Sequence, residues 1–503
     1  MFARGIIVSS QRKLKQILSG VSLSAVLLAF PAGAETLQEA LEYTYVANPT
    51  ILSQRQYVSS VYEKIAQSKA GYKPTVTGDV SYGYQYTRSR TSPLFAEEES
   101  KPVSFGVNAV QSLFSGFQTS ASVKAAKARF EAEIANLNGV EQSTLTDAVA
   151  AYTGVIRDVA IVKLHQNNEA VLKRQLEYTR DRFRVGELTK TDVAQADARY
   201  AAAVSGRIAA EGNLKIAYAV YQKVIGKLPE KIFEPEVPAA KLPQTLDDAI
   251  DIAMKSNPAV TAAEKNAQSA ESSIQVAQSG YYPTLDVQAG YRNTRAAAHG
   301  SMSYIDSGSG SGALASARTG RAREEDTSVM LVMNVPFYRA GTTVSKVREA
   351  KRAAGQAGIN VMAVKRDVSR ATTQAWENYQ ATRSSLSAME EQVKASALAL
   401  DGVKYEEQAG ERTVLDILNA EQELLDARVN VVTAKKNLID AAYNLIASMG
   451  LMTPAGLELD LEKYRKNPIE KTVETREDAE ENKTAEQSAE KTGVENPEQV
   501  DAG

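Results

Sequence analysis

The sequence of 503 residues contains no cysteine and only two histidines, His165 and His299, which lie far apart in the chain. The lack of cysteine excludes a disulfide framework and also an N-terminal cysteine that could carry a lipid. A histidine-based metal site would need carboxylate partners that no spacing singles out. Neither a phosphate-binding Walker A motif nor an HExxH zinc motif occurs. We therefore expect no metal, no cofactor and no enzymatic activity.

Excess positive charge and long apolar runs are missing as well. The formal net charge is −3, so no basic surface argues for binding of nucleic acid. No segment has the 18 or so consecutive apolar residues of a transmembrane helix. Basic residues at 12–15 precede an apolar run at 17–30 that ends in small residues at 32–34. This pattern predicts a signal peptide over 1–34, because the run is too short to serve as a membrane anchor.

The second half of the chain repeats landmarks of the first in the same order. The first two, a TL…NP segment and a GYKP or GYYP segment, recur at an offset of 209 residues. The third, a GELT or GERT segment, recurs at an offset of 224. A long-period duplication predicts two copies of one unit, which we place at 35–240 and 241–465. The 15 additional residues are expected in a Gly/Ser-rich loop at 296–326. The landmarks are TL and NP within 36–49 and 245–258, GYKP at 71–74 with GYYP at 280–283, and GELT at 186–189 with GERT at 410–413.

Alternation of apolar and polar residues follows each of the second landmarks. It predicts strands at about 74–90 and 102–114 in the first copy, and at about 283–295 and 327–338 in the second. Such strands can cross a bilayer, and the tyrosines at 82–86 would suit an interfacial girdle. A soluble hairpin with buried aromatics fits the alternation equally well. Membrane strands must close into a barrel of about eight or more strands, so four strands per chain would require an oligomer. The sequence does not decide between two and three chains.

Helical periodicity fills the rest of each copy, where proline is absent. We predict long helices at about 117–185 and 191–225, and at about 342–409 and 415–449. A continuous helix of the first length would measure about 100 Å. Strands and helix turns are therefore expected at opposite ends of an elongated unit.

Two neighbouring apolar stripes with seven-residue spacing mark the last of these helices. A helix with two seams fits a wall of side-by-side helices, although a broad bundle core gives the same pattern. The first stripe is Leu418, Leu425, Val432, Ile439 and Ile446, and the second is Leu424, Val431, Leu438 and Leu445.

Three segments resemble the TolC family, the outer-membrane exit ducts of Gram-negative efflux pumps and type I secretion systems. They are AYTGVIRDVA at 151–160, RFRVGELTKTDVAQADAR at 182–199 and GERTVLDILNAEQELLDA at 410–427. The resemblance covers about residues 35–465. It implies an α+β membrane protein in which three chains, with four strands each, form a 12-stranded transmembrane β-barrel. A long periplasmic α-helical barrel continues this β-barrel.

The same resemblance implies how such a protein works. A homotrimer in outer-membrane lipid would act as a passive duct for multidrug efflux, type I protein secretion or both. Its partners would be a periplasmic adaptor (membrane fusion) protein and an inner-membrane RND or ABC transporter. The lack of cysteine places the chain with the unlipidated branch of the family.

A periplasmic gate near the helix turns is part of the resemblance. It places Thr191 and Asp192 at the first turn and Arg412 at the second. Arg412 would donate to Thr191 of its own chain and to Asp192 of the next. Asp416 matches one of two acidic rings that constrict the pore and favour cations.

Two positions depart from the family pattern. Glu407 stands where the family has a gate tyrosine, and Asn419 stands at the second acidic ring. The tyrosine–carboxylate bond cannot form, and weaker cation selectivity and weaker divalent block are expected. Glu407 would offset the lost charge only if it faced the lumen, which the sequence leaves open.

Helix capping offers a second interpretation of the gate positions. A glycine turn followed by Thr-x-x-Asp is typical of a helix N-terminus. We favour capping for the threonines and the gate role for Asp192, Arg412 and Asp416. The helix-tip turns comprise Gly186 and Thr189 in the first copy, and Gly410 and Thr413 in the second.

Two segments lie outside the strand and helix pattern. Residues 226–245, with four prolines, are expected to form an irregular collar together with 451–465. Residues 466–503 contain 11 acidic and 5 basic residues and are predicted to be a disordered tail, either solvating or partner-binding. The competing hypothesis for the whole chain is a secreted periplasmic coiled-coil scaffold without membrane insertion. It leaves the four alternating strands unexplained.

Overall fold

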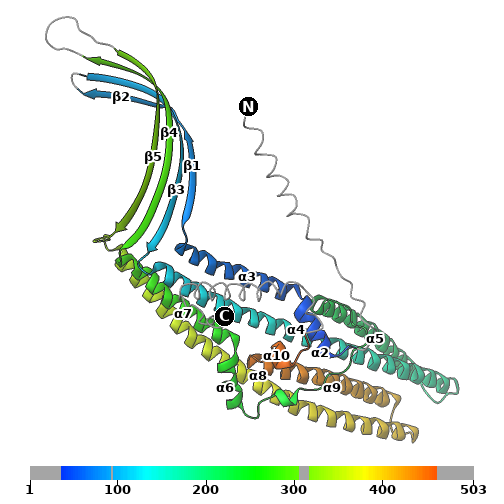
Figure 1. Ribbon diagram of the computed structural model, residues 1–503. Coiled ribbons are helices and arrows are strands. Elements are labelled where there is room, and N and C mark those ends of the chain that lie inside the picture. The colour runs from blue at the N-terminus through cyan, green and yellow to red at the C-terminus, as the bar shows by residue number, and fades with distance from the viewer. Residues whose placement is uncertain (1–34, 92–93, 305–315, 462–503) are drawn as a thin grey trace, which may run out of the picture.

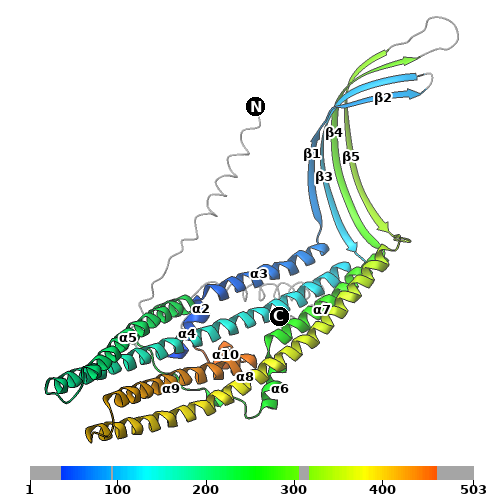
Figure 2. The same cartoon turned by 180° about the vertical axis from the view of Figure 1, so that it is seen from behind.

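The computed structural model describes residues 35–91, 94–304 and 316–461. The predicted signal peptide and acidic tail lie outside these residues. The chain is mostly helical, with one curved sheet at one end and the tips of the longest helices at the other (Figure 1). The view from behind shows the same separation of sheet and helix tips (Figure 2).

The helices follow one another in the same order in the two halves. The first half contains α2 (Leu37–Ala47), α3 (Pro49–Lys69), α4 (Gln118–Arg184) and α5 (Lys190–Ile225). The second contains α6 (Leu246–Ser256), α7 (Pro258–Gln278), α8 (Thr342–Gln408), α9 (Val414–Ser448) and the short α10 (Pro454–Leu457). The strands are β1 (Thr75–Tyr82), β2 (Gln85–Thr91), β3 (Leu94–Phe114), β4 (Thr284–Tyr304) and β5 (Ser316–Asn334).

Two helices of 67 residues, α4 and α8, set the length of the molecule. Each has the predicted extent within one residue at either end, about 100 Å at 1.5 Å per residue. Along α4, the helix α3 packs on the sheet side and α5 packs on the tip side, and α7 and α9 do the same along α8 (Figure 1). Contacts of α4 with α7 and α9 join the two halves.

Four shorter helices, α2, α3, α6 and α7, were not predicted, although the first repeated landmark marks their starts. The Thr36 side chain accepts from the Glu39 backbone, and Asn48 accepts from Thr50 with Pro49 in the first helical turn. Thr245 and Asn257 cap α6 and α7 in the same way. The TL and NP landmarks are therefore helix caps, each of which begins a short helix.

The sheet is antiparallel with strand order β1-β3-β4-β5, and β2 pairs with the part of β3 beyond β1. Its central strands β3 and β4 have 21 residues each and run past their predicted ends. The expected loop at 296–326 is wrong for 296–304 and 316–326, which are strand, while 305–315 lie outside the described residues. Backbone pairing holds these small and polar residues extended without any apolar alternation.

The two faces of the sheet differ in polarity. The register places Val80 opposite Phe105, and Val287 opposite Leu331, on one exposed apolar face. Neighbouring residues on each strand point to the other face and are mostly polar. The apolar face comprises Val76, Val80, Phe105, Val107, Ala109, Leu285, Val287, Ala289, Tyr291, Val329, Leu331 and Met333.

Helix α9 uses its two stripes on two different sides. Leu418 packs with Leu172 and Leu176 of α4, whereas Leu424 packs with Leu400 of α8. Of the two interpretations of the double seam, the wall of side-by-side helices is therefore the one that the packing supports. Among the described helices, none is long and apolar enough to cross a membrane.

The main core lies where the middle of α4 meets α2, α5, α9 and the chain at 226–245 and 451–459. Tyr152 is completely buried there, and its hydroxyl donates to the backbone oxygens of Glu35 and Phe233, each at 2.9 Å. Burial raises the pKa of Tyr152, so the phenol stays neutral. The tyrosine therefore ties Glu35 and the chain at 226–245 to α4, one of the two longest helices.

Replacement of Tyr152 by phenylalanine is expected to destabilise this core. The two carbonyl oxygens would lose a buried donor, at a cost of about 1–3 kcal/mol. The melting temperature of the purified protein should fall, while Tyr57→Phe, a change at a half-exposed tyrosine, should leave it unchanged. Equal melting temperatures for the two variants would contradict this role of Tyr152.

Candidate functional site at the helix tips

The chain reverses direction at two tight turns, one between α4 and α5 and one between α8 and α9. Gly186 and Gly410 adopt φ angles of 85° and 81°, a left-handed conformation that glycine adopts without strain. In the first turn, Gly186 N donates to Phe183 O and Glu187 N donates to Arg182 O, each at 3.0 Å. The second turn has the same pair of bonds. Both turns are Schellman motifs, which end one helix and position the next.

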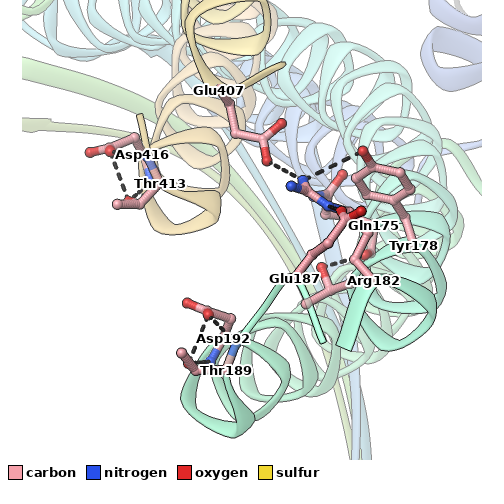
Figure 3. A network of polar contacts seen from close by, with 10 residues as sticks. Gln175, Tyr178, Arg182, Glu187, Thr189, Asp192, Glu407, Thr413 and Asp416 are labelled. Carbon is pink, nitrogen blue, oxygen red and sulfur yellow. Dashed lines mark hydrogen bonds and ion pairs between the residues drawn. The ribbon is translucent and has the colours of Figure 1, made fainter. Parts of the chain in front are cut away.

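Each return helix begins with a capping box (Figure 3). Asp192 accepts from Thr189 N at 2.8 Å, and Asp416 accepts from Thr413 N at 2.9 Å. Each threonine hydroxyl in turn accepts from the backbone of its aspartate. The bond from the Thr413 backbone holds the pKa of Asp416 below its ordinary value. The threonines therefore cap as predicted, and within the protomer both aspartates also belong to the caps.

The Arg412 guanidinium lies on its own turn. Its Nε donates to the Glu406 carboxylate at 3.0 Å, and both side chains are about half exposed. The bond from Arg412 to Thr191 of the same chain, which the resemblance implied, is not formed in the described protomer. Glu406 lies only six residues away across the Schellman turn and is the nearer partner.

Arg182 and Glu407 join the tips of the two halves (Figure 3). Arg182 Nη1 lies 2.6 Å from Glu407 Oε1, and the Glu407 side chain is only 6% exposed. Arg182 Nε also donates to Glu187 at 2.9 Å, and its guanidinium lies 5.4 Å from the centre of the Tyr178 ring. Bonds to Glu187 and Glu407 raise the pKa of Arg182 further, so the guanidinium stays charged at any physiological pH.

A second arginine joins the two halves further from the helix tips. Arg199 of α5 donates to the side-chain oxygen of Asn419 on α9 at 2.7 Å. The position that matches a family acidic ring is therefore neutral and lies next to a cation.

Sequence reasoning did not find Arg182 or Arg199. The sequence did carry a signal at Glu407. A carboxylate that replaces a tyrosine at a helix contact needs a cation or hydrogen-bond donors beside it. Three arginines, at 180, 182 and 184, precede the first turn, and only the folded position of the α8 tip, within side-chain reach of α4, selects Arg182. Arg180 instead pairs with Asp197 of α5, and Arg184 pairs with Asp181.

The arrangement defines a class of protein. Helices of about 100 Å end at one side in polar turns linked by ion pairs, and they lead at the other into long strands with one exposed apolar face. Within the described residues, no group of three or more His, Asp or Glu side chains could hold a metal ion. This is the protomer of an elongated membrane duct.

The model of the outer membrane efflux protein family matches residues 38–227 and 249–451, so the chain belongs to this family. Its function is that of an outer-membrane exit duct for efflux that extends into the periplasm. The family supports a non-enzymatic channel role. The hypothesis of a periplasmic scaffold without membrane insertion is not supported.

Individual relatives agree with the family assignment. The outer membrane efflux protein BepC of Brucella suis is 33% identical over 458 residues, covering 91% of this chain and 94% of the relative. The outer membrane protein TolC of Vibrio cholerae is 26% identical over 415 residues, covering 82% and 89%. A crystal structure of CusC has the same fold, with a TM-score of 0.68, 16% identity, and coverage of 84% of this chain and 95% of CusC.

Loss of one cap should loosen one helix tip. Thr413→Ala removes the hydroxyl that accepts from Asp416 N and should cost about 1 kcal/mol of local stability. Hydrogen exchange of peptides covering 409–417 should then be several-fold faster. Thr382→Ala, which alters a mid-helix hydroxyl bonded to Asn378 O, is the matched control. Unchanged exchange in the Thr413 variant would contradict the capping role.

Proposed function

We propose that three copies of this chain form a duct with a 12-stranded barrel in the outer membrane and a helical tunnel in the periplasm. The observation that carries the proposal is the four-stranded-wide sheet, whose edge strands β1 and β5 have no partner on their outer sides within the described chain. Unpaired edge groups in hydrocarbon would cost several kcal/mol each, so neighbouring copies must pair with them. One chain supplies fewer strands than the smallest known barrels contain.

The apolar face has the height of a membrane. From Leu285 to Asn293 the strand β4 rises about 27 Å, or about 20 Å when tilted by about 40°, close to the apolar band of about 25 Å in such barrels. Above this band Asn293 donates to Glu325 at 2.8 Å, and Glu325 pairs with Arg323. These charges would lie at the outer surface of the membrane.

Aromatic side chains lie at both edges of the band. Tyr82 lies near the outer edge and is 74% exposed. A second group, not predicted, lies where the sheet meets the helices. Its exposed members are Tyr72, Phe117, Tyr281, Tyr282, Phe337 and Tyr338. Tyrosine and other aromatics at both interfaces fit a barrel in outer-membrane lipid.

At the opposite end, the tips form the periplasmic gate of the duct. The Arg182–Glu407 ion pair and the Arg199–Asn419 bond hold the two halves of each chain together. A charged hydrogen bond of this kind contributes about 1.5–3 kcal/mol, which a protein docking at the tips can offset. In this proposal Thr191 and Arg412 lie at the gate, Arg412 bonds Asp192 of the next chain, and Asp416 of each chain forms an acidic ring around the pore.

Energy for transport would come from partners, because nothing in the duct supplies it. A periplasmic adaptor and an inner-membrane RND or ABC transporter are the partners proposed. Drugs and secreted proteins would then leave through one passive path. Asn419 beside Arg199 leaves one acidic ring, at Asp416, so selectivity for cations at the gate would be modest.

The Arg182–Glu407 pair should keep the gate closed. Arg182→Ala and Glu407→Ala should each raise the single-channel conductance of the reconstituted protein, because each removes the same link between α4 and α8. The charge exchange Arg182→Glu with Glu407→Arg should return conductance toward the original value. Arg180→Ala, which breaks a pair within one half, is the control. Unchanged conductance in both single variants would refute this role.

The contact between chains has a separate test. Arg412→Ala should also raise conductance, because the proposed bond to Asp192 of the next chain is lost. Glu406→Ala, which removes the partner of Arg412 within the chain, should not raise it. If the Glu406 variant opens the channel as much as the Arg412 variant, the bond within the turn, and not the bond between chains, closes the gate.

A further inference from the structure

One level of the sheet carries three charged residues on its polar face. Asp79 of β1 lies opposite Gly106 of β3, Gly106 lies opposite Arg292 of β4, and Arg292 lies opposite Asp326 of β5. These four residues form a single row across the sheet. The rows on either side of it on this face are mostly uncharged, with Thr77, Asn108, Gly290 and Ser328 below, and Ser81, Ser104, Thr294 and Glu324 above.

Gly106 makes room for the charged side chains of this row. A Cβ atom at Gly106 would lie 2.6 Å from Asp79 Oδ1, so the Asp79 carboxylate rests on the backbone of β3. There it accepts from Asn108 Nδ2 at 3.3 Å and lies 3.7 Å from Arg292 Nη1. Glycine weakens a strand interior, and this approach of a side chain explains its presence.

The charges of the row do not cancel. Asp79 offsets Arg292, and Asp326 makes no ion pair within the part of the chain that the structure describes. Each chain therefore contributes a net charge of minus one at this level, and Glu324 adds a further carboxylate in the next row. Asp326 is exposed on the polar face.

We propose that this row is a charge filter inside the barrel, which admits cationic cargo more readily than anionic cargo. The inference rests on the proposed trimeric barrel, in which the apolar face contacts lipid and the polar face lines the lumen. Three copies would surround one axis with six carboxylates and three guanidinium groups. Walls of low dielectric constant that carry charge of one sign focus its field into the space they enclose. Arg292 is held to the wall by Asp79, and Asp326 supplies the uncompensated charge.

A purely structural role for these residues makes a different prediction. Cross-strand ion pairs stabilise a sheet by about 0.2–1 kcal/mol, and the pairing of Arg292 with its neighbours could serve only that purpose. If salt in the lumen also screened the field of these charges, neutralising Asp326 or Arg292 would change stability without changing the local potential. A measurement of potential therefore separates the two roles.

The absence of cysteine permits that measurement in the full-length protein. Ser328→Cys introduces one thiol on the polar face, directly below Asp326. Its rates of modification by a cationic trimethylammonium methanethiosulfonate and by an anionic sulfonate methanethiosulfonate are measured in outer-membrane vesicles. The rate ratio, normalised to that of a small free thiol, should favour the cationic reagent. Adding Asp326→Asn should lower the ratio several-fold, and adding Arg292→Gln should raise it several-fold.

Two controls separate the filter from the barrel. Val329→Cys lies next to Ser328 on the apolar face and should react with neither reagent. Glu325→Gln neutralises a carboxylate next to Asp326 on the opposite face and should leave the ratio at Ser328→Cys unchanged. Equal reaction at 328 and 329 would overturn the proposed barrel, and the filter with it. Selective reaction at 328, with a ratio that neither Asp326→Asn nor Arg292→Gln alters, would overturn the filter alone.

Discussion

Backbone hydrogen bonding at the edges of one sheet is the constraint on which the rest of this structure depends. A strand in hydrocarbon has no water to satisfy its amide and carbonyl groups. The outer sides of β1 and β5 have no partner within the described chain, although the sheet between them carries an exposed apolar face. We therefore propose that neighbouring copies complete the sheet and that its exposed apolar side chains contact lipid.

The helices continue from the sheet into the periplasm. Two helices of 67 residues continue the sheet, and the shorter helices complete a wall in which α9 packs on two sides. At the far end, a nearly buried carboxylate, Glu407, needs a cation, and Arg182 from the other half of the chain supplies it. The ion pair adds a polar link between the two halves at the tip, beside the Arg199–Asn419 bond and the apolar contacts of Leu418. A contact of this strength can keep a duct closed at rest and still yield to a docking partner.

Prediction from sequence succeeded where the signal was local. The long helices and their glycine turns followed from periodicity, missing proline and Thr-x-x-Asp spacing, and the caps at Thr189 and Thr413 have the expected geometry. The short helices α3 and α7 were missed because the NP landmark was not interpreted as an asparagine cap followed by a proline in the first helical turn. The outer parts of β4 and β5 were taken for a loop because pairing, not alternation, holds them extended. The Arg182–Glu407 pair joins residues 225 positions apart, so only the folded arrangement of the two helix tips reveals it.

The number of chains in the assembly shows whether three of these sheets close into one barrel. Native mass spectrometry of the full-length protein, extracted from outer membranes in mild detergent, measures that number. Barrel closure with four-stranded-wide sheets predicts a particle of three chains and no stable monomer. A predominant monomer, or a dimer that closes an eight-stranded barrel, would contradict the barrel of three chains.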